Sequence, residues 1–197
     1  WFVSTALVIL LAASVPASAQ YFGQNKVRYR PFDFQVMTTE HFDIYYYLAE
    51  REAVDLAARL AERWYARLER FFGMELSSRQ PLVLYASHPD FEQTNVVAGR
   101  VSEGVGGVTE PMRRRIALPL AGPVGEVDHI IGHELVHAFQ FHLARLFGGS
   151  VQQPALTRLP LWFIEGMAEY VSLGRVNAHA AMKVRDAVRR EHHPARA

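Results

Sequence analysis

The stretch "IIGHELVHAFQF", residues 130–141, decides how the rest of the chain is interpreted. Apolar residues dominate it, and the longer segment 122–149 begins with turn residues and ends with a glycine pair, which predicts a core helix. Residues four apart share one face of a helix, so His133 and His137 project together, about 6 Å apart along the axis. Both imidazoles can then reach one metal ion, and Glu134 lies about 100° further round the helix.

Two interpretations of this helix stay open. Burying two imidazoles and a carboxylate without partners costs free energy, and a bound metal ion removes that cost. The alternative is a pair of hydrogen-bonded core histidines beside a glutamate at the surface. His129 continues the spacing, but it lies about 12 Å along the axis from His137, too far for both to bind one ion. We therefore expect His129 to lie outside the site. His142, five residues after His137, should not share the helix face that carries His133 and His137.

A third metal ligand has to come from elsewhere, because the position six residues after His137 is Leu143 rather than a histidine. The segment "LPLWFIEGMAEYVS" (160–173) offers Glu165 and Glu169, four apart on an otherwise apolar helix. If Glu165 binds the ion, two histidines and one glutamate leave a fourth position open for water, as in catalytic zinc sites. Glu169 can accept a hydrogen bond from the free ring nitrogen of a ligand histidine. The alternative is an ordinary exposed helix face.

The composition excludes several classes of protein. The chain has 197 residues, half of them hydrophobic, which is typical of a folded domain rather than a disordered one. Its net charge of +1, from 21 basic and 20 acidic residues, argues against a nucleic-acid partner. It has no cysteine, so disulfides and thiolate metal sites are excluded. Histidines and carboxylates are the plausible ligands left for a transition metal.

Both ends of the chain differ from its middle. Residues 1–19 are uncharged, with an apolar centre and a small-residue site before Gln20, which predicts a cleaved signal peptide that lacks its own beginning. A membrane anchor is the alternative, but the apolar centre is short for a span, so we expect no membrane span after cleavage. The protein is then exported to the periplasm or outside the cell. Residues 20–34 predict an extended arm, and 176–197 the start of a further, truncated helix.

The segments between these ends mix strands and helices. Aromatic and β-branched residues predict a strand at 41–48, and further strands are expected at 81–87 and, after a glycine-rich turn, 113–120. Apolar residues at threes and fours predict an amphipathic helix at 50–72, ended by Gly73. The order of elements predicts an α+β fold.

The two glutamate-bearing motifs resemble those of a known family. "HELVHAFQF" (133–141) followed by "WFIEGMAEY" (162–170) is similar to the gluzincin, or peptidase MA-like, metallohydrolases, which include thermolysin and the aminopeptidase N family. The resemblance covers residues 35–175. It implies a zincin-like α+β domain, in which a small mixed sheet packs on the helix that carries the first motif and the following helix carries a glutamate ligand.

The resemblance also implies a role for each residue of the motifs. One Zn²⁺ per chain is bound by His133, His137 and Glu165, and Glu134 is the general base that activates a zinc-bound water. Glu169 does not bind the ion itself but lies next to the ligands, where it can accept a hydrogen bond from a ligand histidine. The implied activity is that of a zinc-dependent metallopeptidase acting on peptide or protein substrates.

A looser resemblance concerns the N-terminal part of the domain. Residues 21–47, "YFGQNKVRYRPFDFQVMTTEHFDIYYY", are similar to the start of secreted bacterial proteins in which such a domain precedes a β-propeller of WD40-like repeats. It implies a C-terminal β-propeller in the full-length protein. Two other functions stay open: a catalytically inactive zinc-binding or adaptor domain of such an envelope protein, and a metal-free binding domain.

Overall fold

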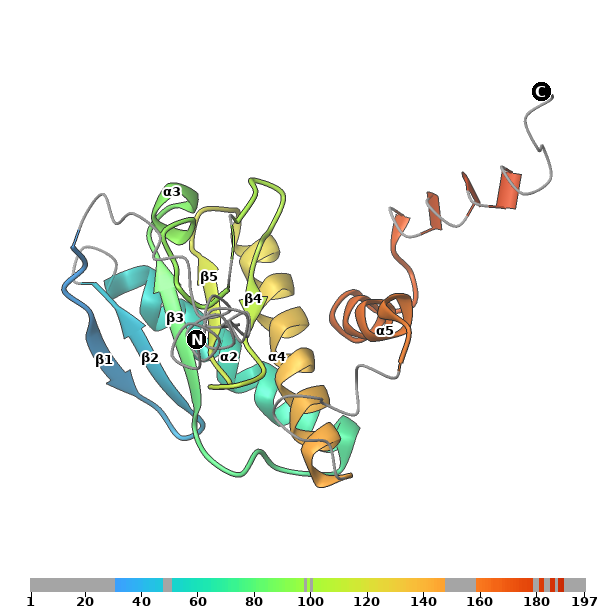
Figure 1. Ribbon diagram of the computed structural model, residues 1–197, viewed down its shortest axis with the longest axis horizontal. Helices are drawn as coiled ribbons and strands as arrows, with labels where there is room; N and C mark the ends of the chain where they lie inside the picture. The colour runs from blue at the N-terminus through green and yellow to red at the C-terminus, as the bar shows by residue number, and fades with distance from the viewer. Residues whose placement is uncertain are drawn as a thin grey trace, which may run out of the picture.

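The computed structural model of the protein describes residues 31–47, 51–97, 99, 101–147 and 159–178, and six residues further on, 181, 182, 185, 186, 188 and 189. The described residues form five strands and four helices (Figure 1). The strands are β1 (Gln35–Thr38), β2 (Phe42–Tyr46), β3 (Gln80–Tyr85), β4 (Val108–Thr109) and β5 (Ile116–Pro119). The helices are α2 (Arg51–Phe72), α3 (His88–Phe91), α4 (Val124–Leu146) and α5 (Leu161–Leu173).

The five strands make one mixed sheet in the order β1-β2-β3-β5-β4. The three central strands, β2, β3 and β5, are parallel, and β1 and β4 are antiparallel strands at the two edges. The register pairs Ile44 with Leu82 and Leu82 with Ile116, so these three buried side chains form a row across the sheet. Such a row of branched apolar residues gives the sheet a continuous surface on which helices pack.

Helices α2 and α4 cover that face of the sheet, and their apolar residues complete one core with it. The apolar positions of α2 recur at threes and fours, as expected, and the helix ends where Gly73 adopts a φ of 67° and donates its N–H to the Glu69 carbonyl. A glycine takes that left-handed conformation without steric cost. In Figure 1, α4 lies between the sheet and α5, and α5 packs on α4.

The opposite face of the sheet carries a smaller apolar cluster. Phe91 of α3 is buried there against Tyr85, and the rings of Phe32 and Phe34, just before β1, pack on Tyr47 and Tyr85. The last four residues of the predicted arm therefore belong to the folded domain.

The predicted α+β class with a mixed sheet is confirmed, but several element limits differ. The strand expected at 81–87 ends at Tyr85, because Ser87 caps α3 by accepting the Asp90 backbone N–H. The strand expected at 113–120 begins only at Ile116, because Arg114 adopts a φ of 53° in a turn. Strands β1 and β4 and helix α3 were not predicted.

Other expectations fall on parts of the chain that the structure does not describe. The predicted signal peptide, residues 1–19, and the arm up to residue 30 lie outside the described residues. The same holds for most of 179–197, although the described residues of that segment have helical backbone. None of the described helices combines the length and the apolar character that a membrane span requires.

Candidate metal centre

Helix α4 packs on α2 at Gly132, the residue just before the first motif. A Cβ on Gly132 would lie 2.5 Å from Cε2 of Trp64, so a side chain at this position would collide with a buried ring. The Trp64 indole N–H also donates to Asp128, at 2.7 Å. These contacts fix the rotation of α4, and a different side of the helix then presents His133 and His137 to a cleft.

Three potential ligand atoms meet in that cleft. The Nε2 atoms of His133 and His137 lie 3.1 Å apart. Glu165 of α5 places its Oε2 3.3 Å from the first and 3.4 Å from the second. The three residues predicted as metal ligands are therefore brought together, and they form a group that could hold a metal ion.

The size of this triangle is compatible with tetrahedral coordination of a metal ion. In tetrahedral zinc sites the ligand atoms lie about 2.0–2.1 Å from the metal, which puts neighbouring ligand atoms about 3.3 Å from one another. The observed separations of 3.1, 3.3 and 3.4 Å match that value. Burial lowers the pKa of His133, and the nearby ring of His137 lowers it further. A neutral imidazole is the form that binds a metal.

Glu134 lies beside this group and is 6% exposed. The hydroxyl of Thr109, on edge strand β4, lies 2.6 Å from Oε2 of Glu134 and 2.9 Å from its backbone carbonyl. Burial raises the pKa of the Glu134 carboxyl, while the Thr109 hydrogen bond and the charge of His137 act in the opposite direction. A Cβ on Gly107 would lie 2.8 Å from Cγ of Glu134, so only a glycine lets β4 approach this closely.

The cleft has a volume of about 920 Å³. Its walls come from the glycine-rich segment 104–107, strand β4, α4 and α5. Four glutamates line it, Glu126, Glu134, Glu165 and Glu169, and no lysine or arginine is among its described lining residues. The cleft is therefore an acidic groove that suits a cation, and it is open enough for an extended ligand.

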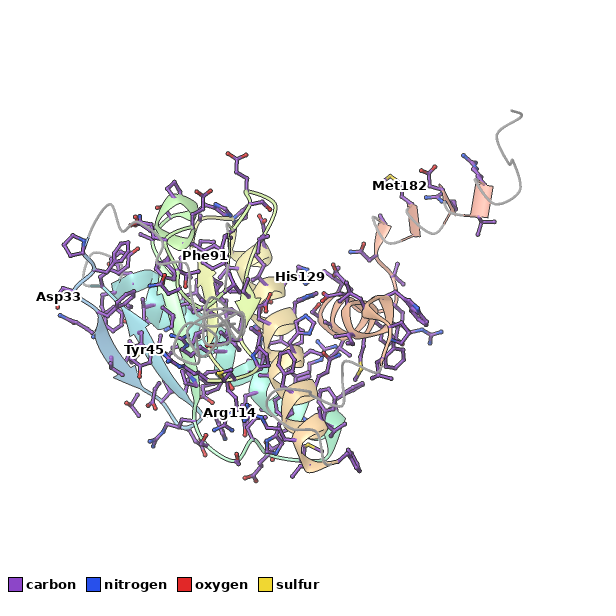
Figure 2. All side chains as sticks on the ribbon, in the orientation of Figure 1. Asp33, Tyr45, Phe91, Arg114, His129 and Met182 are labelled. Carbon is purple, nitrogen blue, oxygen red and sulfur yellow. The ribbon has the colours of Figure 1, made fainter. Side chains whose placement is uncertain are left out.

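Glu169 and His129 form a neighbouring pair in the same cleft. Glu169 Oε2 lies 3.5 Å from His129 Nε2, and with His133 these two residues make a second group that could hold a metal ion. Figure 2 labels His129 on the side of α4 that faces α5. We expected His129 to lie outside the site, but the structure places it in the cleft wall. The predicted bond from a ligand histidine to Glu169 stays a prediction.

Sequence reasoning missed two hydrogen-bonding residues of the site. Thr109 lies in a segment for which we expected only a turn, and nothing in its neighbourhood indicates a contact with Glu134. Gln140, three residues after His137, is buried, and its Oε1 lies 2.8 Å from His137 Nδ1. Its helical spacing from His137 is the signal that could have identified it.

The chain was compared with models of protein families, with curated proteins and with solved structures. None of them matches it. The resemblance of the two motifs to gluzincins therefore stays a prediction.

Proposed function

We propose that this protein is a zinc-dependent metallopeptidase with a zincin-like catalytic domain, binding one zinc ion per chain through His133, His137 and Glu165. The observation that carries the proposal is the convergence of these three ligand atoms beside the buried carboxylate of Glu134. A purely structural zinc site closes all four positions with protein ligands. Here, three protein ligands lie in the wall of an open cleft, which favours a catalytic site.

Zinc is the metal that this donor set favours. Two imidazoles and one carboxylate, at separations suited to tetrahedral coordination, are typical of catalytic zinc in hydrolases. When bound, the zinc ion supplies a Lewis acid that polarises a carbonyl group and makes a water molecule more acidic. The two imidazole donors also argue against calcium and magnesium, which take oxygen ligands.

Glu134 is the proposed general base. Its carboxylate accepts a proton from the attacking water and later passes it to the leaving amine of the cleaved peptide. The Thr109 hydroxyl engages Oε2 and holds the side chain, so Oε1 is the oxygen left to accept the proton. The raised pKa of this carboxyl makes it a better proton acceptor than an exposed glutamate.

The shape of the cleft supports an extended peptide as the substrate. Strand β4 pairs with β5 along one side, and no other described strand pairs with its outer side. A peptide can add to such an edge through backbone hydrogen bonds, which would bring its scissile bond near His133, His137 and Glu165. The volume of about 920 Å³ accommodates several residues. We further propose, from the sequence, that the protein is exported and acts on peptides or proteins outside the cytoplasm.

A second candidate is a catalytically inactive domain in which zinc joins two helices and α5 serves as an adaptor surface. The exposed apolar side chains of α5 favour it, because Leu161, Trp162 and Tyr170 are all more than half exposed. Such a surface is typical of a site that contacts another protein or domain. A propeller domain following in the full-length protein is the partner that the sequence resemblance suggests.

The test combines elemental analysis with a peptidase assay on the purified protein and its Glu134→Gln variant. We expect one zinc per chain in both proteins and cleavage of casein by the wild type. The variant should cleave about 10²–10⁴ times more slowly, the usual contribution of a general base. Its amide keeps the shape of the side chain and can still accept from Thr109, so its fold is preserved.

Two other outcomes bear on the peptidase function and the adaptor function. A folded wild type without bound metal would contradict both zinc functions. One zinc per chain with no activity that depends on Glu134 would support the adaptor function instead.

A further inference from the structure

Gln140 connects the two helices that supply the proposed zinc ligands. It lies on α4, is 5% exposed, and makes two hydrogen bonds through its side-chain amide. Its Oε1 lies 2.8 Å from Nδ1 of His137. Its Nε2 donates to the backbone carbonyl of Ile164 on α5, at 3.1 Å. Ile164 immediately precedes Glu165, so one amide contacts one ligand directly and the backbone beside another.

These two contacts determine which ring nitrogen of His137 carries its proton. A backbone carbonyl can only accept a hydrogen bond, so the NH₂ end of Gln140 must face Ile164. The oxygen of the amide then faces His137, and an oxygen can only accept, so Nδ1 of His137 must donate. In the neutral ring the proton is therefore on Nδ1, and Nε2 keeps a free lone pair.

Nε2 is also the atom of His137 that the proposed metal site needs. It lies 3.1 Å from Nε2 of His133 and 3.4 Å from Oε2 of Glu165. In the other tautomer, with the proton on Nε2, that nitrogen has no free lone pair, and the ring would have to give up this proton and take one up on Nδ1 before Nε2 could bind the ion.

We propose that Gln140 is a positioning residue that holds His137 in its metal-binding tautomer and holds the first turn of α5, so that Glu165 reaches the same ion. The inference rests on the proposed zinc site. Both amide ends are satisfied only when α5 lies against α4, because one of the two partners is a carbonyl of α5. Seating of α5 and orientation of His137 are thereby coupled through a single side chain.

The experiment compares three variants of the full chain. Gln140→Met keeps approximately the length of the side chain and removes both hydrogen bonds. Gln140→Glu keeps an acceptor for His137 but loses the donor to Ile164. Gln80→Met is the matched control. Gln80 lies on β3 outside the cleft, is buried, and its side-chain amide also donates to backbone carbonyls.

Two quantities are measured. The first is the zinc dissociation constant, from competition with a chromophoric chelator. We expect it to rise about 10–100-fold in Gln140→Met, as is usual when the partner of a ligand histidine is lost, and to change less than about 3-fold in Gln80→Met. Gln140→Glu should lie between the wild type and Gln140→Met. The second is the tautomer of His137 in the metal-free protein, from long-range ¹H–¹⁵N NMR spectra, which should show Nδ1–H in the wild type and a mixture in Gln140→Met.

The two measurements keep this inference separable from the proposed function. A metal-free wild type with His137 protonated on Nε2 would overturn the inference, even if Gln140→Met failed to fold. So would a zinc affinity that Gln140→Met leaves unchanged, or one that Gln80→Met weakens equally. A wild type that has the Nδ1–H tautomer but binds no zinc would contradict the proposed function, and it would remove the metal-positioning role together with it.

Discussion

The two helices that form the candidate site are held in very different ways. Twelve of the 23 residues of α4 are buried, whereas only Ala168 and Val171 are buried among the 13 residues of α5. Glu134 and His137 on α4 are less than a tenth exposed, while the Glu165 side chain on α5 is 47% exposed. The core therefore fixes two of the proposed ligands and the proposed base, and the third proposed ligand lies on a helix with only two buried residues.

This difference in burial predicts that folding alone positions the residues on α4, whereas the position of Glu165 on α5 also depends on a bound metal ion. Elements with few buried apolar contacts open at low free-energy cost, and core helices open only with the whole domain. We expect α4 to keep its geometry without a metal ion. Binding of zinc between the histidines and Glu165 should then stabilise the position of α5.

The largest effect is expected for Glu165→Ala. Removing a metal ligand weakens binding more than removing a residue that only hydrogen-bonds a ligand. The zinc affinity should therefore fall by at least about 100-fold. The free energy of unfolding of the metal-free protein should change by no more than about 0.5 kcal/mol, since the side chain is half exposed. Isothermal titration with zinc and urea denaturation measure the two quantities. Glu169→Ala, one helical turn further on, is the control and should weaken zinc binding much less.

The next effect concerns removal of the metal by a chelator. With zinc at about 100 times its dissociation constant, binding stabilises the closed state by about 2.7 kcal/mol, so amide exchange in α5 should become about 100-fold faster when the zinc is removed. Amides in the middle of α4 should exchange at nearly the same rate with and without zinc. Hydrogen exchange followed by mass spectrometry measures both helices in one sample. Equal acceleration in α4 and α5 would mean that the two helices open as one unit.

A smaller effect is expected from Gly132→Ala on α4. The new Cβ would lie 2.5 Å from the buried ring of Trp64, and overpacking of this kind costs about 1–3 kcal/mol. Alanine regains up to about 1 kcal/mol in helix propensity, so we expect a net loss of about 1–2 kcal/mol in the free energy of unfolding. Urea denaturation of the metal-free protein measures it. A neutral or stabilising result would show that α2 and α4 are not locked together at this point.

Gly166→Ala on α5 is the matched substitution with the smallest effect. A Cβ at Gly166 meets no atom within 4 Å, so the same chemical change is free of collision. Alanine favours the helix by up to about 1 kcal/mol, and we expect unchanged or slightly slower amide exchange in α5 and a zinc affinity within about 3-fold of the wild type. Faster exchange would indicate that α5 is more closely packed at Gly166 than the structure describes.

Sequence reasoning succeeded where periodicity extends over several turns or a whole strand. The period of α2 follows from burial of one face, so its limits were predicted to within a residue or two. The spacing of His133 and His137 follows from helix geometry, and the structure places both on one face of α4. Strand β4, with two residues, and helix α3, with four, are too short for any period to appear.

The parts of the site that were missed depend on contacts between distant segments. Thr109 reaches Glu134 only because β4 is the edge strand beside α4, and topology of that kind is not visible in a local pattern. The exposure of the apolar side chains of α5 was also not predictable, because an apolar helix in a sequence looks the same whether or not the domain covers it. For Glu165 the sequence left a metal ligand and an exposed helix face as alternatives, and the structure shows a side chain that is 47% exposed and lies close to both histidines.

Two of the three tryptophans, Trp64 and Trp162, give the two halves of the site separate optical signals. Trp64 is 5% exposed and lies against Gly132, whereas Trp162 on α5 is 74% exposed. A buried indole emits at shorter wavelength than one in water. In a Trp1→Phe variant, the fluorescence of the folded protein should therefore contain a blue component from the α2–α4 contact and a red component from α5. The red component should respond to an acrylamide quencher and to zinc, and the blue one to global unfolding. The chain thus contains its own reporters for distinguishing the undocking of one helix from the loss of the whole fold.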